Sequence, residues 1–356
     1  MINSLRIENF RCFKDLALED LARINIITGD NAAGKSTILE AIFIACNPNV
    51  RGIIKLNDSR IPPLPILQKD NFFSLVERYF NDPYSRIVFE VDKKNSDSSE
   101  KWKVEMIILR RLSEFSTPSS ISPFQEPCLE FKITENNKPE KKPEKILIGF
   151  TDNNLVQQHG PFKEILPNKF FFSNSIQIPS ESAGILSSLI EKKEESVLLD
   201  AFKKVYPEIE DILILVPADF PNGAVFFKIK DPDIIIPSTL YSSGTHKSFT
   251  ILLAAADPRL KQQGIILVDE IENGIHWSRM QSFWRLLDDV TTKTQIQVFA
   301  TTHSYECLES FVDIMKKPVE FTIIHAKKDP KTNEFSASVI PGEFAESAIK
   351  SRLEIR

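Results

Sequence analysis

A glycine-rich stretch near the start of the chain has the residue types and spacing that bind phosphate groups. It fits the pattern G-x-x-x-x-G-K-[ST] and consists of Gly29, Asp30, Asn31, Ala32, Ala33, Gly34, Lys35 and Ser36, followed by Thr37. In such a loop the backbone amides surround the phosphates, the lysine reaches the β- and γ-phosphates, and the hydroxyl binds Mg²⁺. The sequence therefore predicts a nucleotide site that uses Lys35 and Ser36.

The segments on either side of this loop predict the structural context that it needs. Residues 22–28 are an apolar run typical of a short buried strand, and residues 37–45 contain few helix breakers. Amides at a helix start point toward a bound anion, and the helix dipole favours it. The alternative is a glycine-rich turn that fits by chance, which average amino-acid usage produces in about one chain of this length in a hundred.

Two adjacent carboxylates follow another apolar strand much later in the chain. Residues 264–268 predict a buried strand, and Asp269 and Glu270 come directly after it. Ligands of open α/β sheets bind at the carboxyl ends of the strands. We therefore expect Asp269 to hold Mg²⁺ through its water shell and Glu270 to act as general base toward the attacking water. The alternative is a pair of solvated surface acids.

Two further stretches contain residues that suit a phosphate. His303 follows the apolar run 296–299 and could bind the γ-phosphate, although a histidine is more often structural. Ser242 and Gly244 precede a predicted helix at 248–256, where small residues form either an anion site or an ordinary N-cap.

Arg11 and Lys14, before the glycine-rich loop, are either solvated charges or contacts to phosphate or adenine.

The composition sets limits on the class of protein. The chain has 356 residues and a net charge of −5, which gives no bulk attraction to nucleic acid. Its four cysteines are far apart and form no C-x-x-C, so buried free thiols in a reducing compartment are expected. No signal peptide or membrane-length apolar run is visible. These features predict a cytoplasmic protein without membrane association.

The remaining segments predict an α/β fold with a mixed sheet, an antiparallel β subdomain and a helical lobe. Alternating residues indicate strand pairs at 86–91 with 102–109 and at 129–133 with 146–150, and another pair at 209–215 with 224–229. One helix is expected from 180 to 206 and a shorter one from 70 to 79. Proline-rich or polar residues indicate variable loops at 47–70, 92–101 and 113–145.

Taken together, these motifs resemble an ABC-type ATPase head, and more narrowly the OLD (overcoming lysogenization defect) and RecF-like AAA ATPases of bacteria. The opening Ile7–Lys14, the glycine-rich loop (Walker A), the signature stretch Y-S-S-G-T-H-K at 241–247, the Walker B and D-loop stretch at 269–276, and T-T-H-S at 301–304 occur in the family's order. The resemblance implies a P-loop NTPase that binds ATP and Mg²⁺.

The resemblance also implies how the residues work together. Two heads would form a homodimer with two ATP molecules between them, and assembly beyond the dimer remains open. Ser242 and Gly244 would contact the γ-phosphate held by Lys35 of the other copy, and His303 would sense that phosphate. Asn273–His276 would cross the interface. The signature departs from that of transporters at Tyr241, Ser243 and Lys247, and Gln68 is the candidate for the glutamine loop.

The expected organisation is a single bilobed head over 1–356. It has a P-loop lobe at 1–178, a helical and signature lobe at 179–256, and a Walker B and His-switch part at 257–356. About 50 residues follow the His303 motif, too few for the metal-dependent Toprim nuclease domain of many OLD proteins. The resemblance therefore implies a separate nuclease partner, with indirect contact to DNA, as in some anti-phage systems.

These observations leave four functions open. The first is ATP hydrolysis that drives or gates a DNA-directed effector. The second is an ATP-gated scaffold or sensor with little turnover, which Lys35 and Glu270 variants would distinguish by partner binding. A RecF-like repair ATPase would shift the mobility of duplex DNA in a salt-sensitive way. A transporter subunit would co-purify with a membrane permease.

Overall fold

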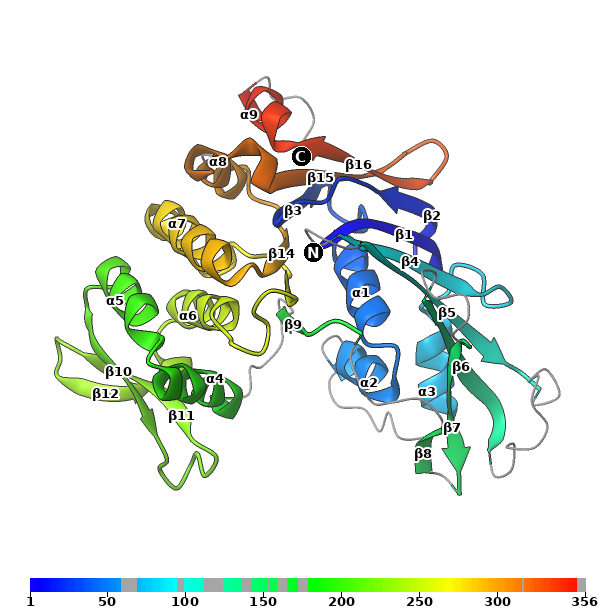
Figure 1. Ribbon diagram of the computed structural model, residues 1–356, viewed down its shortest axis with the longest axis horizontal. Helices are drawn as coiled ribbons and strands as arrows, with labels where there is room; N and C mark the ends of the chain where they lie inside the picture. The colour runs from blue at the N-terminus through cyan, green and yellow to red at the C-terminus, as the bar shows by residue number, and fades with distance from the viewer. Residues whose placement is uncertain are drawn as a thin grey trace. The chain divides into compact units, whose positions relative to one another are not determined.

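The computed structural model describes residues 1–58, 69–94, 99–111, 124–135, 142–152, 154–158, 165–171, 179–315 and 317–350. The chain forms two compact units (Figure 1). Unit 1 contains Met1–Ala22, Ile27–Leu166 and Ile324–Ile340, and unit 2 contains Arg23–Ile26, Pro167–Ile323 and Pro341–Arg356. The predicted lobes are continuous stretches of sequence, whereas strand pairing builds both units from separate segments.

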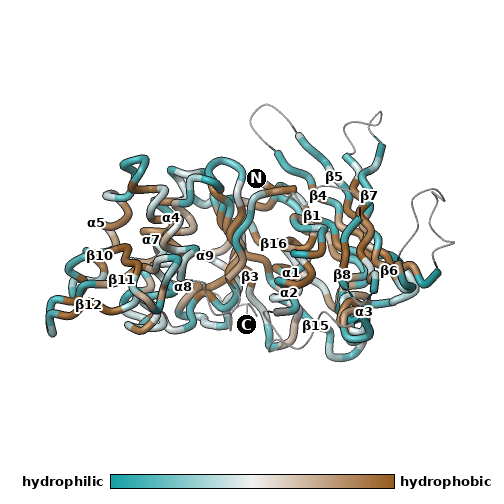
Figure 2. Tube along the Cα trace, turned by 90° about the horizontal axis from the view of Figure 1, so that it is seen from below, coloured by the Kyte–Doolittle hydropathy of each residue, from teal (hydrophilic) through white to brown (hydrophobic). Residues whose placement is uncertain are grey.

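Unit 1 contains a seven-stranded antiparallel sheet in the order β2-β1-β4-β5-β6-β7-β8. Its strands are β1 (Ile2–Phe10), β2 (Phe13–Leu18), β4 (Ile87–Lys94), β5 (Ser99–Leu109), β6 (Gln125–Glu135), β7 (Glu144–Thr151) and β8 (Asn154–Gln158). The predicted pairs β4–β5 and β6–β7 are confirmed. The hydrophilic ends of β4 and β5 are visible in Figure 2. Pairing of Lys94 with Ser99 extends this hairpin, so the loop expected at 92–101 is mostly strand.

In the described part of unit 1, the helices are α1 (Lys35–Cys46), α2 (Val50–Asp58) and α3 (Lys69–Glu77). The interpretation of residues 47–70 as loop is wrong for 50–58. The side chain of Asn49 accepts a hydrogen bond from Gly52 N at 3.0 Å, and the buried Ile53 and Leu56 give α2 an apolar face. The predicted helix at 70–79 is confirmed as α3, which packs Phe72 against Phe150 of β7.

Unit 2 contains a sheet that carries the second group of motifs. Strand β13 (Ile265–Val268) pairs in parallel with β9 (Asn168–Phe171) and β14 (Gln297–Thr301). Strands β13 and β14 are buried along their whole length, which explains why β13 and the middle of β14 are apolar. The first residues of β3 (Ile24–Gly29) and β15 (Phe321–Lys328) extend this sheet in the order β15-β3-β14-β13-β9. Their remaining residues belong to unit 1, as does β16 (Phe335–Pro341) except for its last residue.

The helical part of unit 2 departs from the single helix predicted at 180–206. Two helices are present, α4 (Pro179–Lys192) and α5 (Glu195–Val205). Lys193 has a left-handed backbone with φ 57°, and Glu194 N bonds to Leu189 O at 3.0 Å. This geometry ends α4 and redirects the chain. The predicted strands β10 (Ile209–Leu215) and β11 (Ala224–Ile229) are confirmed, and β12 (Ile234–Pro237) adds an unpredicted third strand.

The remaining elements of unit 2 are helical. These elements are η3 (Ser238–Leu240), α6 (Ser243–Ala255), α7 (Trp277–Thr294), α8 (Tyr305–Ile314), η4 (Pro318–Glu320) and α9 (Gly342–Lys350). Tyr305 Oη donates to Ile349 O at 2.9 Å and so connects α8 to α9.

The described part of the chain contains no helix with the length and apolar character needed to cross a membrane.

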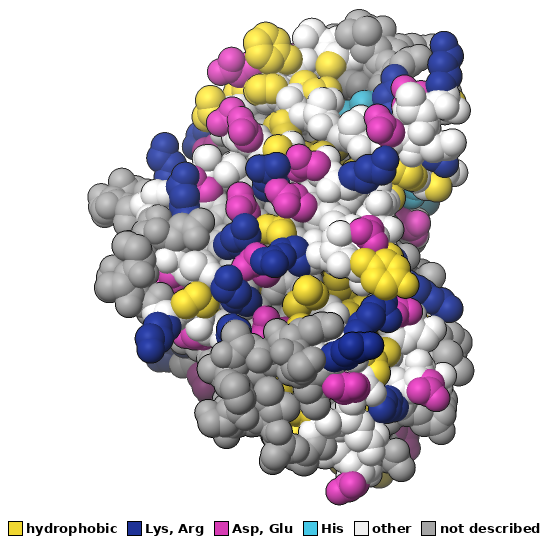
Figure 3. All heavy atoms as spheres, turned by 90° about the vertical axis from the view of Figure 1, so that its right-hand side faces the viewer, with side chains coloured by type: hydrophobic (Ala, Val, Ile, Leu, Met, Phe, Trp, Pro, Cys, Tyr) yellow, Lys and Arg dark blue, Asp and Glu magenta, His cyan; other side chains and the backbone are white. Residues whose placement is uncertain are grey.

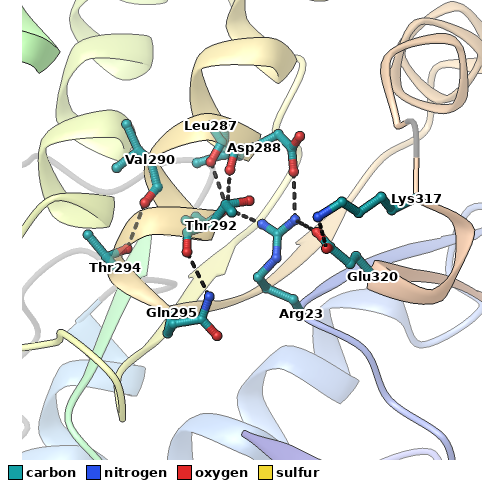
Figure 4. Close-up of polar contacts among 10 residues, drawn as sticks. Arg23, Leu287, Asp288, Val290, Thr292, Thr294, Gln295, Lys317 and Glu320 are labelled. Atoms are coloured by element: carbon teal, nitrogen blue, oxygen red, sulfur yellow. Dashed lines mark hydrogen bonds and ion pairs between the residues drawn. The ribbon is translucent and has the colours of Figure 1, made fainter.

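A buried arginine joins three elements of unit 2. Arg23 is 5% exposed, and its guanidinium donates to Asp288 Oδ1 at 2.6 Å and to Glu320 Oε2 at 2.5 Å. Figure 4 shows how these side chains meet and how Lys317 approaches the same Glu320. A third hydrogen bond, to Thr291 Oγ1, satisfies the other arm of the guanidinium. Arg23 therefore fixes the start of β3 to α7 and η4.

Replacing Arg23 by Met is expected to lower the free energy of unfolding by about 1–3 kcal/mol at pH 7. This is below the cost of breaking a fully buried pair, because Asp288 and Glu320 are 28% and 26% exposed. The hydrogen bond from Lys317, and then that from Arg23, lowers the pKa of Glu320 from its usual 4.5. This stabilisation is present above pH 4.5 and is lost as pH falls through the lowered pKa.

The difference between wild type and the Arg23→Met variant should therefore shrink below pH 4.5. Denaturant unfolding at pH 7 and in acid measures it. A difference that does not depend on pH would contradict a role for Glu320.

Candidate nucleotide site

The glycine-rich loop of unit 1 has a backbone that only glycine accommodates at two positions. Gly29 has φ 135°, and a Cβ atom there would lie 1.9 Å from the carbonyl oxygen of Ala326. Gly34 has φ 95°, and its Cβ would lie 2.8 Å from the ring of Phe13. Between them Asp30, Asn31 and Ala32 are exposed. The spacing of the two glycines thus follows from close packing at both ends of an exposed loop.

Helix α1 begins at this loop with features that suit an anion. Its N-cap is Gly34, which supplies no side-chain acceptor, and its first turn contains no acidic residue. Lys35 is 4% exposed, and its Nζ donates to Gly29 O at 2.6 Å and to Asp30 O at 2.7 Å. Ser36 and Thr37 follow, half-buried, in the first turn. Amides, dipole and ammonium are therefore gathered at one helix end.

The two cations before this loop have different roles. Arg11 Nε lies 2.8 Å from Glu40 Oε2, and Glu40, on α1, is completely buried. The guanidinium also lies 5.0 Å from the ring centre of Tyr79. Lys14 is 76% exposed and lies 3.9 Å from Glu334. Arg11 is therefore neither a solvated charge nor a free ligand group, because it neutralises a buried carboxylate, whereas Lys14 is a surface cation.

In unit 2 the hydroxyl of Thr301 connects the carboxylate of Asp269 to the backbone of Glu270. It donates to Asp269 Oδ1 at 2.7 Å and accepts from the backbone N–H of Glu270 at 2.8 Å. Thr301 is the last residue of β14 and is fully buried, while Asp269 is 8% exposed. Parallel pairing of β13 with β14 brings these strand ends together. This contact fixes both acids at the carboxyl edge of the sheet.

The carboxylate of Glu270 lies among polar groups and is about one-third exposed. Its Oε2 accepts a hydrogen bond from Asn273 Nδ2, and its Oε1 lies 3.7 Å from His303 Nε2. The backbone of Glu270 is left-handed, with φ 49°, which costs about 1–3 kcal/mol for a residue other than glycine. Strain of this kind is typical of functional positions. The backbone N–H of His303 donates to Glu272 Oε1 at 2.7 Å, which holds the histidine beside Glu270.

The signature stretch packs directly on the D-loop within unit 2. Ser242 is the N-cap of α6 and accepts from Thr245 N at 3.5 Å, so the capping interpretation holds, and Ser242 and Ser243 are exposed. Gly244 is buried, and a Cβ atom there would lie 1.7 Å from Gly274 O. Gly274 itself has φ 79°. The two glycines thus allow two backbone segments to touch.

Replacing Gly244 by Ala is expected to lower the free energy of unfolding by about 1–3 kcal/mol, because the added methyl group collides with a backbone carbonyl. Gly184 provides the control, since a Cβ there meets nothing within 4 Å and lies within α4. Gly184→Ala should stabilise the protein by about 0.5–1 kcal/mol. Thermal unfolding of both variants measures the difference, and equal midpoints would contradict the close contact.

The sequence profile of the family described as "AAA domain, putative AbiEii toxin, Type IV TA system" matches residues 24–309. The chain belongs to this AAA family. It is 27% identical over 345 residues to the "ATP/GTP phosphatase" of Helicobacter pylori, with 89% of each chain covered. It is 22% identical over 346 residues to the "OLD nuclease" of Thermus scotoductus, covering 85% of this chain and 59% of that relative.

This chain also matches a "DNA replication and repair protein RecF" of Idiomarina loihiensis, at 49% identity over 43 residues, which is 12% of each chain. The resemblance to OLD and RecF-like AAA ATPases is confirmed. This chain spans less than two thirds of the length of the OLD relative.

Solved structures of Smc heads share the fold of this AAA family member. One, bound to the C-winged helix domain of ScpA, has a TM-score of 0.55 at 12% identity and covers 97% of this chain and 99% of its own. Another, from Pyrococcus furiosus, has a TM-score of 0.50 at 11% identity and covers 99% of each. The predicted P-loop fold of the ABC-ATPase head type is confirmed. By family and fold the chain is an ATPase.

The expected magnesium ligands have the right chemistry for that ion. The hydroxyl of Ser36 in unit 1 and the carboxylate of Asp269 in unit 2 are both oxygen donors, which Mg²⁺ prefers. Thr301 fixes one oxygen of Asp269. The residues therefore fit a magnesium ion by donor type.

Sequence reasoning located most of these residues but missed the role of Thr301. The only sequence signal is its position at the end of β14, beside the His303 motif. The assignment of Gln68 to the glutamine loop lies outside the described residues. Contact of Ser242, Gly244 and His303 with the γ-phosphate stays a prediction.

Proposed function

We propose that this AAA family member hydrolyses ATP in a Mg²⁺-dependent reaction in which Glu270 is the general base. The observation that carries the proposal is the arrangement around Glu270. Its partly exposed carboxylate contacts Asn273 and lies 3.7 Å from His303, while Thr301 fixes its backbone and the neighbouring Asp269. A general base needs access to water and a fixed orientation, and this residue has both.

Each residue has a defined part in the proposed reaction. Lys35 and the amides of the glycine-rich loop bind the β- and γ-phosphates. Glu270 takes a proton from the water that attacks the γ-phosphorus, the bond from that phosphorus to the β-phosphate oxygen breaks, and ADP and phosphate leave. Ser36 and Asp269 would hold magnesium, which would neutralise phosphate charge when bound. His303 contacts the γ-phosphate.

We further propose that two copies form a homodimer around ATP. Ser242 and Ser243 are exposed at the start of α6, and Asn273 and Gly274 are exposed beside them. A helix start with exposed small residues suits a phosphate presented by a second copy. Ser242 and Gly244 would then contact the γ-phosphate bound at Lys35 of the other copy.

The proposed partner is a separate DNA-directed effector such as a nuclease, which the dimer drives or gates in defence against phage. The name of the relative, OLD nuclease, supports a nuclease as the effector. Figure 3 shows Lys and Arg side chains beside Asp and Glu on one face of the molecule. In the unit 1 sheet, cations pair with carboxylates: Arg6 with Asp15, Lys101 with Asp92, Lys132 with Glu105 and Lys145 with Glu130. Because these cations already pair with carboxylates, they are less available to DNA phosphates, which favours contact with DNA through the effector.

Light scattering tests the dimer. The mass of the Glu270→Gln protein, which should retain ATP, is measured with and without Mg²⁺ and ATP. Doubling of the mass on adding both is expected. A protein that remains monomeric would contradict the shared site. An oligomer that forms equally without ATP would instead favour the scaffold function.

A further inference from the structure

Lys247 on α6 directs a half-buried ammonium group at backbone oxygens of the Walker B segment. Its Nζ donates to Glu270 O at 2.5 Å and lies 3.5 Å from Asp269 O. Within the described ranges no carboxylate oxygen lies within 4.0 Å of this Nζ. These two contacts tie the Lys247 side chain to the backbone of the Walker B segment.

The backbone of Glu270 needs such support. Its φ of 49° is unfavourable for a residue with a Cβ atom. The N–H of Glu270 donates to Thr301 Oγ1 at 2.8 Å, and the carbonyl accepts from Lys247. The peptide groups on both sides of this residue are therefore held by side chains from two other elements, β14 and α6.

We propose that Lys247 is a positioning residue for the ATPase reaction, because its ammonium holds the Glu270 carbonyl and so maintains the left-handed turn that orients the carboxylate. This inference rests on the proposed role of Glu270 as general base. The proposed reaction assigns Lys247 no contact with the phosphates or with the attacking water.

The same helix contacts this segment at a second place. Gly244, three residues before Lys247, meets the backbone of Gly274. Helix α6 is thus joined to both ends of the 270–274 turn, once by an ammonium–carbonyl bond and once by backbone packing. A displacement of the signature end of α6 is therefore transmitted to Glu270. The nucleotide contact proposed for Ser242 would in this way be coupled to the general base.

The charges near Lys247 act against the effect of its burial. Burial lowers the pKa of Lys247 from its usual value, and the carboxylates of Glu272, Glu270 and Asp269 oppose that shift. The adjacent His246 adds no positive charge at neutral pH, because burial lowers its pKa to about 4.

The test compares three lysine variants of the full chain. Lys247→Met is expected to lower kcat by about 10- to 100-fold, as a misplaced catalytic group does, while ATP affinity and the unfolding midpoint stay near wild type. Lys247→Arg, which keeps a charged donor, should recover most of kcat. Lys261→Met is the matched control, since Lys261 is 47% exposed and lies 3.6 Å from Glu194, and it should behave as wild type.

Hydrogen exchange of the 269–274 segment supplies a second readout, which should accelerate in Lys247→Met alone. A wild-type kcat in Lys247→Met, or equal losses of kcat and ATP affinity, would overturn the inference. The variant Glu270→Gln separates the two proposals. If it retains full turnover, the general-base role fails, and unchanged exchange in Lys247→Met would refute the backbone contact independently.

Discussion

The Glu270→Gln variant is expected to bind ATP as wild type does and to hydrolyse it about 10²–10⁴-fold more slowly. Glutamine has the same shape and keeps an oxygen that accepts the hydrogen bond donated by Asn273. Its amide cannot take a proton from water. The loss should therefore appear in kcat and leave nucleotide affinity largely intact.

Glu309→Gln is the matched control for this experiment. Glu309 is an exposed acid on α8, so the same substitution there changes the net charge equally without touching the site. Phosphate release and binding of a fluorescent ATP analogue would be measured on both variants. Turnover by Glu270→Gln equal to that of Glu309→Gln would show that another group activates the water.

The Arg11→Met variant is expected to lose about 3–5 kcal/mol of unfolding free energy. Glu40 is completely buried on α1, and Arg11 Nε lies 2.8 Å from its Oε2. Removing the cation takes its ion pair from a carboxylate that is completely buried. The stacking of the guanidinium over Tyr79 is also lost. Because α1 starts at the glycine-rich loop, ATP affinity should fall as well.

Two further variants show whether charge is the cause. Lys14→Met removes an exposed cation from the next strand and should change the free energy of unfolding by less than about 0.5 kcal/mol. The double variant Arg11→Met with Glu40→Leu replaces both charges by apolar groups and should recover most of the stability. Denaturant titration gives all values. A double variant no more stable than Arg11→Met would indicate that shape, and not charge, is responsible.

The sequence alone determined the parts of the molecule that depend on neighbouring residues. The glycine-rich loop was predicted because Gly29, Gly34 and Lys35 act within one strand–loop–helix unit. The apolar runs before Asp269 and His303 identified β13 and β14, since a strand buried on both faces is mostly apolar. The family resemblance followed from the order of these local motifs, and the comparisons confirmed it.

Only the tertiary structure decided which distant groups meet. Nothing near Thr301 in the sequence indicates that its hydroxyl joins Asp269 to Glu270, which lie more than thirty residues away. Likewise, the partners of Arg11 and Lys247 depend on where α1 and α6 pack. Local pattern determines how a segment folds and which face it buries. The orientation of Glu270 depends instead on long-range hydrogen bonds, which exist only after strands and helices far apart in the chain have packed together.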